Sequence, residues 1–440
     1  MKALDRQRVL VETKVANCCD PKQIFSYARR RLRAKEDLAV IRRPNGSFAT
    51  DDSEKAELIS RHFATTYEPG EVRVPTPAII PPGVSQLENV DVEPETVLRY
   101  LLRLPGKKSM TPEGVPAIFF KRAAPGLAKP LSLIYKRSLA EGVIPEGYRT
   151  AIIAPVHKSG DKTDPANKRP VSLTAVSCKV IERILADQIY VNANAQCLLS
   201  DEQFAYRPGR STTQCVLEYL NDLAICTNDR TPVDTLMFDL KNAFEMCDHD
   251  TLVSVLPTMG IGQTLRQWIS DFLRRRTFRV RVGAHLSSEV KVTRGCPQGT
   301  VLGSICFLMY FDCVKRIFPP EIRFKIYADD LKIYALVRSE DERRRLQKAA
   351  DDFLAWTERM GLRVSSSKCC VFHYGSNNPC HQYFLGDKPL EVRSEIKDLG
   401  IHITEKLDFQ SHVTHVLKKA ARITNWIMRA FTLRRPGPYL

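Results

Sequence analysis

Two adjacent aspartates between apolar segments constrain the fold of this 440-residue chain more than any other feature of its sequence. In KIYADDLKIYAL (325–336), alternating apolar residues predict a strand that leads to Asp329 and Asp330. Leu331 and Ile333 flank the pair on its far side, which puts the two aspartates at the tip of a hairpin. Adjacent carboxylates repel each other and gain nothing structurally without a cation. A cation site is one interpretation, and an ordinary Asp-Asp β-turn is the alternative.

A further carboxylate follows a separate apolar strand. Residues 236–238 (LMF) predict a buried strand, and Asp239 comes where that strand ends. A lone aspartate in this position is often a helix N-cap, which is the alternative interpretation. Together with the hairpin, Asp239 supplies the additional oxygen ligands that a two-magnesium site needs. Mg2+ prefers carboxylate oxygens, and the ions of such a pair lie about 3.5–4 Å apart.

A glycine-rich loop precedes a strongly apolar segment. Gly295 and Gly299 bracket Pro297 and Gln298, so the backbone of this loop can approach another segment closely. A helix is expected directly after the loop. A plain turn is the alternative, because a glycine-rich turn before a helix is not specific by itself.

Composition and charge narrow the classes of protein further. Apolar residues make up 43% of the chain, and no apolar run reaches the roughly 18–20 residues that span a bilayer. The formal net charge is +16, with basic clusters at 28–35, 274–281 and 409–440. One such cluster fits a solvated face, but three together favour contacts with nucleic-acid phosphates. Thirteen scattered cysteines favour free thiols in a reducing compartment.

Helical and strand periodicities predict an α/β (α+β) class with several hairpins. Residues 68–95 are rich in proline and are expected to form an extended linker. Helices are expected at 51–67, around 96–103, from the end of a loop at 107–116 to about 140, at 176–189, 212–226 and 263–275, and up to Gly361. Strands are expected at 150–156 and, as a hairpin, at 278–282 and 290–292.

The order of the motifs resembles a known family. FDLKNAF, GCPQGTVLGS, YADD and SSSKC follow one another as in the palm of reverse transcriptases. Segments 152–185, 202–216 (EQFAYRPGRSTTQCV) and 398–413 resemble the corresponding segments of non-LTR (LINE-type, Jockey-like) retrotransposon enzymes. The resemblance implies a right-hand polymerase with fingers and palm, an antiparallel palm sheet packed on helices, and the start of a helical thumb.

The resemblance also implies an order of domains along the chain. A basic N-terminal extension and the proline-rich linker are expected at 1–95, mainly fingers at 96–232, and mainly palm with the catalytic carboxylates at 233–397. Residues 398–440 are expected to form the palm-to-thumb junction and a truncated thumb, as in a fragment of a longer open reading frame.

The resemblance assigns metal-binding roles to four residues. Asp239 and Asp329 are expected to be direct metal ligands, Asp330 the third acid, and Leu240 the donor of a backbone carbonyl. The expected cofactor is a pair of Mg2+ ions, for which Mn2+ can substitute.

Nucleotide-binding roles follow in the same way. Lys158 and Arg169 match fingers cations that hold the incoming triphosphate, and Gln298 matches a loop residue beside the nucleotide. Phe244 matches the aromatic residue under the sugar that excludes a 2′-hydroxyl, with a plain core aromatic as the alternative. Lys368 matches the lysine that protonates the pyrophosphate leaving group.

Three positions depart from the family pattern. Loop 109–114 (SMTPEG) lacks the usual Gly-Pro-Asp, Glu245 stands where an aspartate is usual, and Ser304 stands where a proline is usual. None of these departures removes an expected metal ligand.

The function implied by the resemblance is that of an RNA-directed DNA polymerase, a nucleotidyltransferase that extends a primer 3′-hydroxyl with dNTPs in a non-LTR retrotransposon. The expected partners are an RNA template, a DNA primer or nicked target DNA, and dNTPs, with no membrane. The expected location is intracellular, in nucleus and cytoplasm, without secretion. The alternative is a catalytically inactive nucleic-acid-binding relic, and the oligomeric state is left open.

Overall fold

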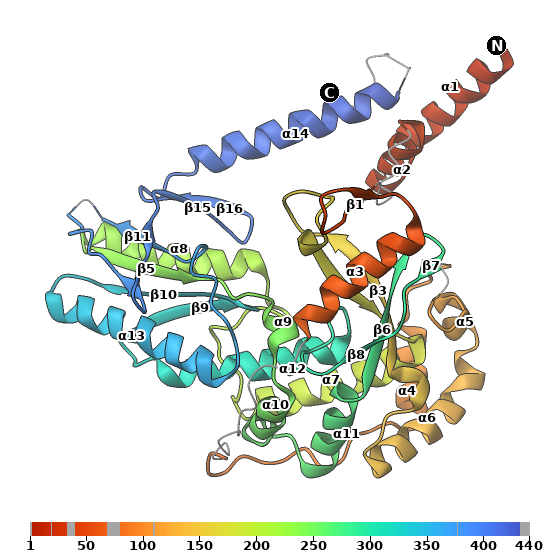
Figure 1. The fold of residues 1–440 in the computed structure, drawn as a ribbon, viewed down its shortest axis with the longest axis horizontal. Coiled ribbons are helices and arrows are strands. Elements are labelled where there is room, and N and C mark those ends of the chain that lie inside the picture. The colour runs from red at the N-terminus through yellow and green to blue at the C-terminus, as the bar shows by residue number, and fades with distance from the viewer. Residues whose placement is uncertain are drawn as a thin grey trace. The chain divides into compact units, whose positions relative to one another are not determined.

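The computed structural model describes residues 2–18, 20–32, 40–67, 80–108, 111–375 and 377–431. The chain divides into two compact units (Figure 1), one of residues 40–394 and one that joins residues 1–39 to residues 395–440. Much of the expected linker, residues 68–79, lies outside the described residues. The domain boundaries expected at 95, 232 and 397 stay predictions.

The smaller unit consists of helices and one short hairpin. Its elements are α1 (Lys2–Asn17), α2 (Pro21–Arg31), β15 (Glu395–Asp398), β16 (Ile401–Thr404) and α14 (Gln410–Ala430). The Tyr27 hydroxyl donates a hydrogen bond to Glu12 over 2.8 Å. The Phe25 ring stacks on Trp426 with centroids 6.1 Å apart. The first contact joins α1 to α2, and the second joins the two ends of the chain into one unit.

The larger unit combines helices with two main sheets. Its helices are α3 (Asp52–Thr66), α4 (Pro94–Leu102), α5 (Ala117–Arg122), α6 (Ala124–Glu141), α7 (Val176–Ala195), α8 (Thr212–Asn228), α9 (Ala243–Met246), α10 (His249–Val255), α11 (Gln263–Leu273), α12 (Val301–Asp312) and α13 (Glu340–Arg359). Its strands are β1 (Ile41–Arg42), β2 (Phe48–Ala49), β3 (Thr150–His157), β4 (Lys168–Leu173), β5 (Val233–Phe238), β6 (Arg276–Val282), β7 (His285–Leu286), β8 (Val290–Val292), β9 (Arg323–Tyr327), β10 (Asp330–Leu336), β11 (Cys370–Tyr374), β12 (Phe384–Leu385), β13 (Lys388–Pro389) and β14 (Glu391–Val392).

The first main sheet has the strand order β14-β11-β5-β10-β9, and β5 is buried along its whole length. A strand buried on both faces needs a cover on each side. The Phe238 ring packs on Phe353 of α13 at 4.7 Å, whereas Thr235 accepts a hydrogen bond from the hydroxyl of Tyr219 on α8 over 3.0 Å. The sheet is therefore sandwiched between α8 and α13 (Figure 1).

The second main sheet has the order β4-β3-β6-β7, with β8 paired to β6. β3 and β4 form an antiparallel hairpin, and β6 lies parallel to β3 on its other side. Burial alternates along β4, so one face of this strand packs inward and the other faces solvent. The expected hairpin of residues 278–282 and 290–292 is confirmed by the antiparallel pairing of β6 with β8.

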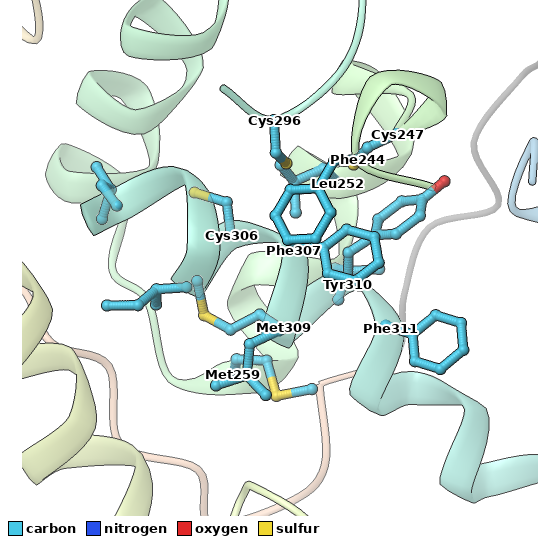
Figure 2. Packing of buried hydrophobic residues seen from close by; sticks show 14 of the residues in the cluster. Phe244, Cys247, Leu252, Met259, Cys296, Cys306, Phe307, Met309, Tyr310 and Phe311 are labelled. Carbon is cyan, nitrogen blue, oxygen red and sulfur yellow. The ribbon is translucent and has the colours of Figure 1, made fainter. Parts of the chain in front are cut away.

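Helix α12 lies in the core of the larger unit (Figure 2). Ten of its residues are buried, including Phe307 and Phe311, whose rings stack 5.9 Å apart. The strongly apolar segment after the glycine-rich loop is thus a fully covered helix, as its sequence predicts. The α/β (α+β) class is also confirmed.

Capping residues explain where two helices begin. Asp51 accepts a hydrogen bond from the backbone N–H of Glu54 over 3.0 Å, which confirms the predicted start of α3. Helix α13 begins at Glu340, because Ser339 and Glu342 form a capping box, so this helix carries a turn ahead of its first predicted apolar residue, Leu346. None of the described helices is both long and apolar enough to cross a membrane.

Candidate active site

Strand pairing brings two of the predicted carboxylates together. Leu331 of β10 lies opposite Phe238 of β5, so the start of β10 reaches the end of β5, where Asp239 follows. Burial, together with the negative charge of Asp239, raises the pKa of the Asp329 carboxyl above its usual range. The two side chains therefore share one electrostatic environment, although 90 residues separate them in the sequence.

The turn that carries Asp329 is held in an unusual backbone conformation. Ala328 has a φ of 60°, which costs a non-glycine residue about 1–2 kcal/mol. Its N–H donates a hydrogen bond over 3.3 Å to the side-chain oxygen of Gln203, which is fully buried. Backbone hydrogen bonds also join Glu202 and Phe204 to Ile326, at 2.8 Å and 3.0 Å. Segment 202–204 thus fixes the turn from outside the hairpin.

The other two predicted metal ligands lie beside this pair. Asp330 is exposed and pairs across the hairpin with Tyr327. Leu240 is buried, and its backbone forms a bridge with Val364. Within the described ranges, no three His, Cys, Asp or Glu side chains gather closely enough to hold a metal ion. The structure thus brings Asp239 and Asp329 together, and the roles of Asp330 and Leu240 stay predictions.

Lys368 lies at the carboxylate pair. Its ammonium group is 3.0 Å from Oδ2 of Asp239, and the two side chains are 55% and 29% exposed. The backbone of Ser365 donates a hydrogen bond to the carbonyl of Asp239 over 2.8 Å, which fixes this segment beside the end of β5. Lys368 therefore neutralises part of the charge that a metal ion would otherwise balance. Its predicted role as a proton donor stays a prediction.

The β3–β4 hairpin presents the two predicted fingers cations. Lys158 directly follows β3 and bonds through its N–H to Asn167 over 2.9 Å, and Arg169 lies in β4; both side chains are exposed. The positive charges of Lys158 and Arg169 oppose the rise in the pKa of Asp329. The hairpin thus places both cations within electrostatic reach of the carboxylates.

Phe244 lies in α9, between the two sheets. Its ring stacks on Phe307 at 4.0 Å with an interplanar angle of 18° (Figure 2), and only 7% of its surface is exposed. The edge of a second ring, Tyr206, lies against it at 5.9 Å and 80°. Phe244 is therefore a buried core residue beside the half-exposed Tyr206, and its role under the sugar stays a prediction.

The glycine-rich loop closes the site from another side. Gly295 has a φ of 93°, and a Cβ atom there would lie 2.8 Å from the carbonyl of Glu245, so only glycine fits this close approach. The next residue, Cys296, bonds to the carbonyl of Phe244 over 2.7 Å. The carbonyl of Gln298 accepts a hydrogen bond from Ser172 of β4 over 2.8 Å. The loop thus ties α9 to the strand that carries Arg169.

Glu245 is a buried acid at this site, with 4% of its surface exposed. Burial, with a further contribution from the charge of Asp329, raises the pKa of the Glu245 carboxyl to about 7. Lys158 and Arg169 act in the opposite direction. Glu245, which stands where the family usually has an aspartate, is therefore a buried titratable group near the carboxylates.

A second departure has a structural role. The carboxylate of Glu113 accepts hydrogen bonds from the N–H groups of Val176 and Ser177 over 2.7 Å and 3.2 Å, and from the Ser177 hydroxyl. These are groups at the N-terminus of α7, where a negative charge is favourable. The predicted loop at 107–116 therefore caps this helix from a distant part of the sequence, although residues 109 and 110 lie outside the described part.

The central basic cluster contains both buried and exposed arginines. Arg276 is 2% exposed and packs on the Phe272 ring at 4.9 Å. Arg274 and Arg275 form ion pairs with Asp250 and Asp271. Arg276 therefore serves an internal contact, whereas Arg274 and Arg275 are exposed, and the phosphate contacts expected of this cluster stay a prediction.

Sequence reasoning did not single out two residues of the site. Gln203 holds the turn at Ala328, and Tyr206 contacts Phe244. Both belong to segment 202–216, which was linked to the family only as a block. Gln203 directly follows Ser200, Asp201 and Glu202, so no local pattern sets it apart, and none indicates which distant ring Tyr206 meets.

A buried sheet that brings carboxylates from two strands together beside a cationic hairpin is the arrangement of the right-hand polymerases. The family profile described as "Reverse transcriptase (RNA-dependent DNA polymerase)" matches residues 156–403. This match covers more than half of the chain, so the chain belongs to the reverse transcriptase family. The family predicted from the motif order is thereby confirmed.

Curated relatives come from transposable elements of Drosophila melanogaster. The probable RNA-directed DNA polymerase from transposon X-element is 24% identical over 84% of this chain and 42% of its own length. The corresponding protein from transposon BS is 26% identical over 85% and 43%, and the RNA-directed DNA polymerase from mobile element jockey is 23% identical over 89% and 44%. The chain thus spans less than half of the length of each of these relatives.

Among solved structures, the chain is similar to telomerase from Candida Tropicalis in complex with a fragment of telomeric RNA. The two share 12% sequence identity at a TM-score of 0.42, over 64% of this chain and 48% of that chain.

Proposed function

We propose that this domain is the polymerase of a non-LTR retrotransposon, which extends a primer 3′-hydroxyl with dNTPs along an RNA template. The observation that carries the proposal is the meeting of Asp239 and Asp329 from two separate strands, with Lys158 and Arg169 within electrostatic reach of Asp329. An arrangement with carboxylates on one side and cations on the other is suited to binding a phosphate group while it is attacked.

The chemistry of the donor set fits Mg2+. The charge of Asp239 contributes to the raised pKa of Asp329, so a divalent cation between them would be favoured, and hard oxygen ligands are those that Mg2+ prefers. Asp239 and Asp329 would hold two ions, with Asp330 and the carbonyl of Leu240 as further ligands and Mn2+ as a substitute. When bound, these ions supply positive charge to the attacking and leaving oxygens of an in-line displacement.

The chain's own residues would position the nucleotide. Arg169 can bind two phosphate oxygens at once through its planar guanidinium group, and Lys158 adds a point charge at the same hairpin. Gln298 would lie beside the nucleotide in a loop that is anchored to β4. Lys368 would release Asp239 when metal binds and would then be free to donate a proton to the leaving pyrophosphate.

Phe244 would set the choice of sugar from beneath the nucleotide. Its ring cannot move toward α12, because Phe307 is stacked directly on it. A rigid aromatic surface leaves no room for a 2′-hydroxyl, which favours deoxynucleotides. The partners of the domain would therefore be an RNA template, a DNA primer or nicked target DNA, and dNTPs, inside the cell.

Primer extension tests the proposal directly. The protein, an RNA template with an annealed DNA primer, the four dNTPs and Mg2+ should yield an extended primer, and Asp239→Ala should yield none. Binding of the same template–primer, measured in parallel, should be nearly equal for both proteins. Tight binding by the wild-type protein without any extension would contradict the proposal and favour a nucleic-acid-binding relic.

A further inference from the structure

The aromatic surface at the nucleotide site belongs to two residues rather than one. Phe244 is 7% exposed, whereas 41% of the surface of Tyr206 is exposed. The Tyr206 and Phe244 rings are nearly perpendicular, with centroids 5.9 Å apart, and the Phe244 ring also stacks on Phe307 at 4.0 Å. A molecule that approaches Phe244 from solvent therefore also meets Tyr206.

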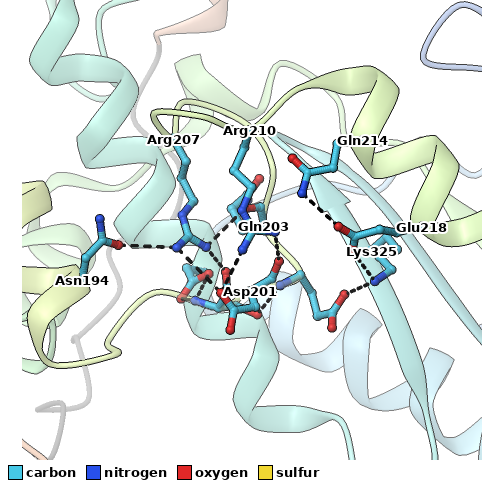
Figure 3. Close-up of polar contacts among 11 residues, drawn as sticks. Asn194, Asp201, Gln203, Arg207, Arg210, Gln214, Glu218 and Lys325 are labelled. Carbon is cyan, nitrogen blue, oxygen red and sulfur yellow. Dashed lines mark hydrogen bonds and ion pairs between the residues drawn. The ribbon is translucent and has the colours of Figure 1, made fainter.

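Tyr206 lies in a turn that fixes its backbone. Its φ of 56° is in the left-handed region, which an ordinary side chain occupies only when its surroundings enforce it. Arg207 donates a hydrogen bond to the carbonyl of Gln203 over 3.4 Å, and Arg210 donates hydrogen bonds to the carbonyl and the carboxylate of Asp201 over 3.0 Å and 2.9 Å. Figure 3 shows these side chains directed back into the turn.

The same turn is joined to the catalytic hairpin. Gln203 begins the segment and accepts the hydrogen bond from Ala328, next to Asp329. Burial, followed by the charge of Asp329, raises the pKa of Tyr206 to about 12, and Arg169 acts in the opposite direction. The Tyr206 side chain thus lies among the acid and the cation that the proposed function assigns to the nucleotide.

No hydrogen bond to the described residues holds the Tyr206 hydroxyl. Two buried tyrosines of the same unit behave differently: Tyr135 donates to the carbonyl of Ser177 over 2.7 Å, and Tyr383 donates to Asp234 over 2.7 Å. Tyr206 is therefore positioned through its ring and its backbone, and the ring contact with Phe244 is the feature on which its role depends.

We propose that Tyr206 is a second specificity-determining residue of the nucleotide site, which keeps the Phe244 ring from turning toward solvent and narrows the space for a 2′-hydroxyl. The inference rests on the proposed function. Because its ring stacks on Phe307 and contacts Tyr206, the Phe244 side chain is held in one position. Without the Tyr206 ring, the Phe244 ring can move toward the vacated space, so the site then admits a ribose more easily.

The test compares kcat/KM for dNTPs with kcat/KM for rNTPs on one RNA template and primer. Tyr206→Ala is expected to lower this discrimination ratio about five- to tenfold, since edge-on ring pairs and small differences in pocket size act on that scale. Tyr206→Phe keeps the ring and should retain the wild-type ratio. Phe244→Ala should lower the ratio at least as much, and the double variant should add little, because Tyr206 acts through Phe244.

Phe384→Ala is the matched control. Phe384 is 43% exposed, close to the exposure of Tyr206, but it lies in the β12–β13 hairpin. Loss of this ring should leave the ratio unchanged. If Tyr206→Ala does not fold, as judged by a thermal melt, Tyr206→Leu retains apolar volume without a ring and should also lower the ratio.

The outcomes separate the inference from the proposed function. If the wild-type protein extends no primer, the proposed function is contradicted, and the role inferred for Tyr206 is contradicted as well. A wild-type protein that extends primers, together with a folded and active Tyr206→Ala or Tyr206→Leu variant of unchanged ratio, overturns only the role of Tyr206.

Discussion

The two main sheets of the larger unit carry opposite charges in opposite environments. All six residues of β5 are buried, and this strand leads to Asp239. β4 alternates between buried and solvent-facing residues, and the exposed Arg169 lies on its solvent-facing side. Asp239 thus follows a fully buried strand, and the cations extend from a hairpin with solvent on one face.

The difference has a physical reason. Carboxylates that must share cations gain from fixed positions, because a site assembled in advance costs no reorganisation when charge develops. A phosphate ligand must enter and leave, so the groups that bind it are better placed where water can replace it. Buried Glu245 and exposed Lys158 extend the same contrast to their neighbours.

The largest expected effect is on the acidic side. Asp329→Ala should reduce primer extension more than a hundredfold, because loss of metal-mediated charge stabilisation costs several kcal/mol in the transition state. Affinity for the template–primer should stay within about twofold, since the substitution leaves the basic clusters expected to contact nucleic-acid phosphates unchanged. Steady-state extension and a binding titration measure the two quantities. Extension above a few per cent of the wild-type rate would refute the role of Asp329 as a metal ligand.

The buried acid Glu245 should give the next largest effect, on stability. Its pKa of about 7 in the folded protein lies above that of an unfolded chain, so its stabilising contribution is complete below about pH 4.5 and is lost as the pH rises through 7. The loss amounts to about 3 kcal/mol between these limits. Glu245→Gln should remove this dependence, so the variant gains stability over the wild type as the pH rises.

Urea unfolding at pH 5 and pH 8 measures this change. Glu321→Gln, at an exposed position, is the matched control and should follow the wild-type pH dependence. If the free energies of unfolding of the wild type and of Glu245→Gln change with pH in parallel, the pKa of Glu245 is not raised in the folded protein.

A smaller effect is expected on the cationic side. Arg169→Lys keeps the charge but loses the bidentate geometry, so the KM for dNTPs should rise about tenfold while kcat changes little. Arg281→Lys is the matched control at an exposed position of β6 and should leave KM unchanged. Equal KM values for Arg169→Lys and the wild type would contradict the assignment of nucleotide binding to Arg169 of the β3–β4 hairpin.

The smallest effect concerns salt. The logarithm of the affinity for a single-stranded template should fall linearly with the logarithm of salt concentration, with a slope of about −0.7 for each phosphate contact. Lys418 and Lys419 are exposed on α14, and replacing both with glutamine should make the slope shallower by about 1.4 if both contact phosphates. If the affinity of the wild-type protein for the template does not change with salt concentration, its net charge of +16 does not contribute to template binding.

The placement of the carboxylates could be predicted because it depends on local patterns. An apolar strand that ends in Asp239 and a hairpin that ends in two aspartates are each visible within about a dozen residues. Since both motifs end buried strands, one antiparallel pairing is enough to bring them together. The start of α13 was not predicted, although Ser339 and Glu342 form a local capping pattern. The internal use of Arg276 was missed because burial depends on partners that are not evident from the pattern.

The sequence by itself determined which residues carry charge, where the main strands end, and that the motifs follow the order of a reverse transcriptase. Only the tertiary structure decided that Gln203 holds the turn at Ala328, that Lys368 lies on Asp239, and that Tyr206 meets Phe244. These contacts join segments far apart in the chain. Their formation depends on how whole elements pack, and a difference of one residue in register would direct each side chain elsewhere.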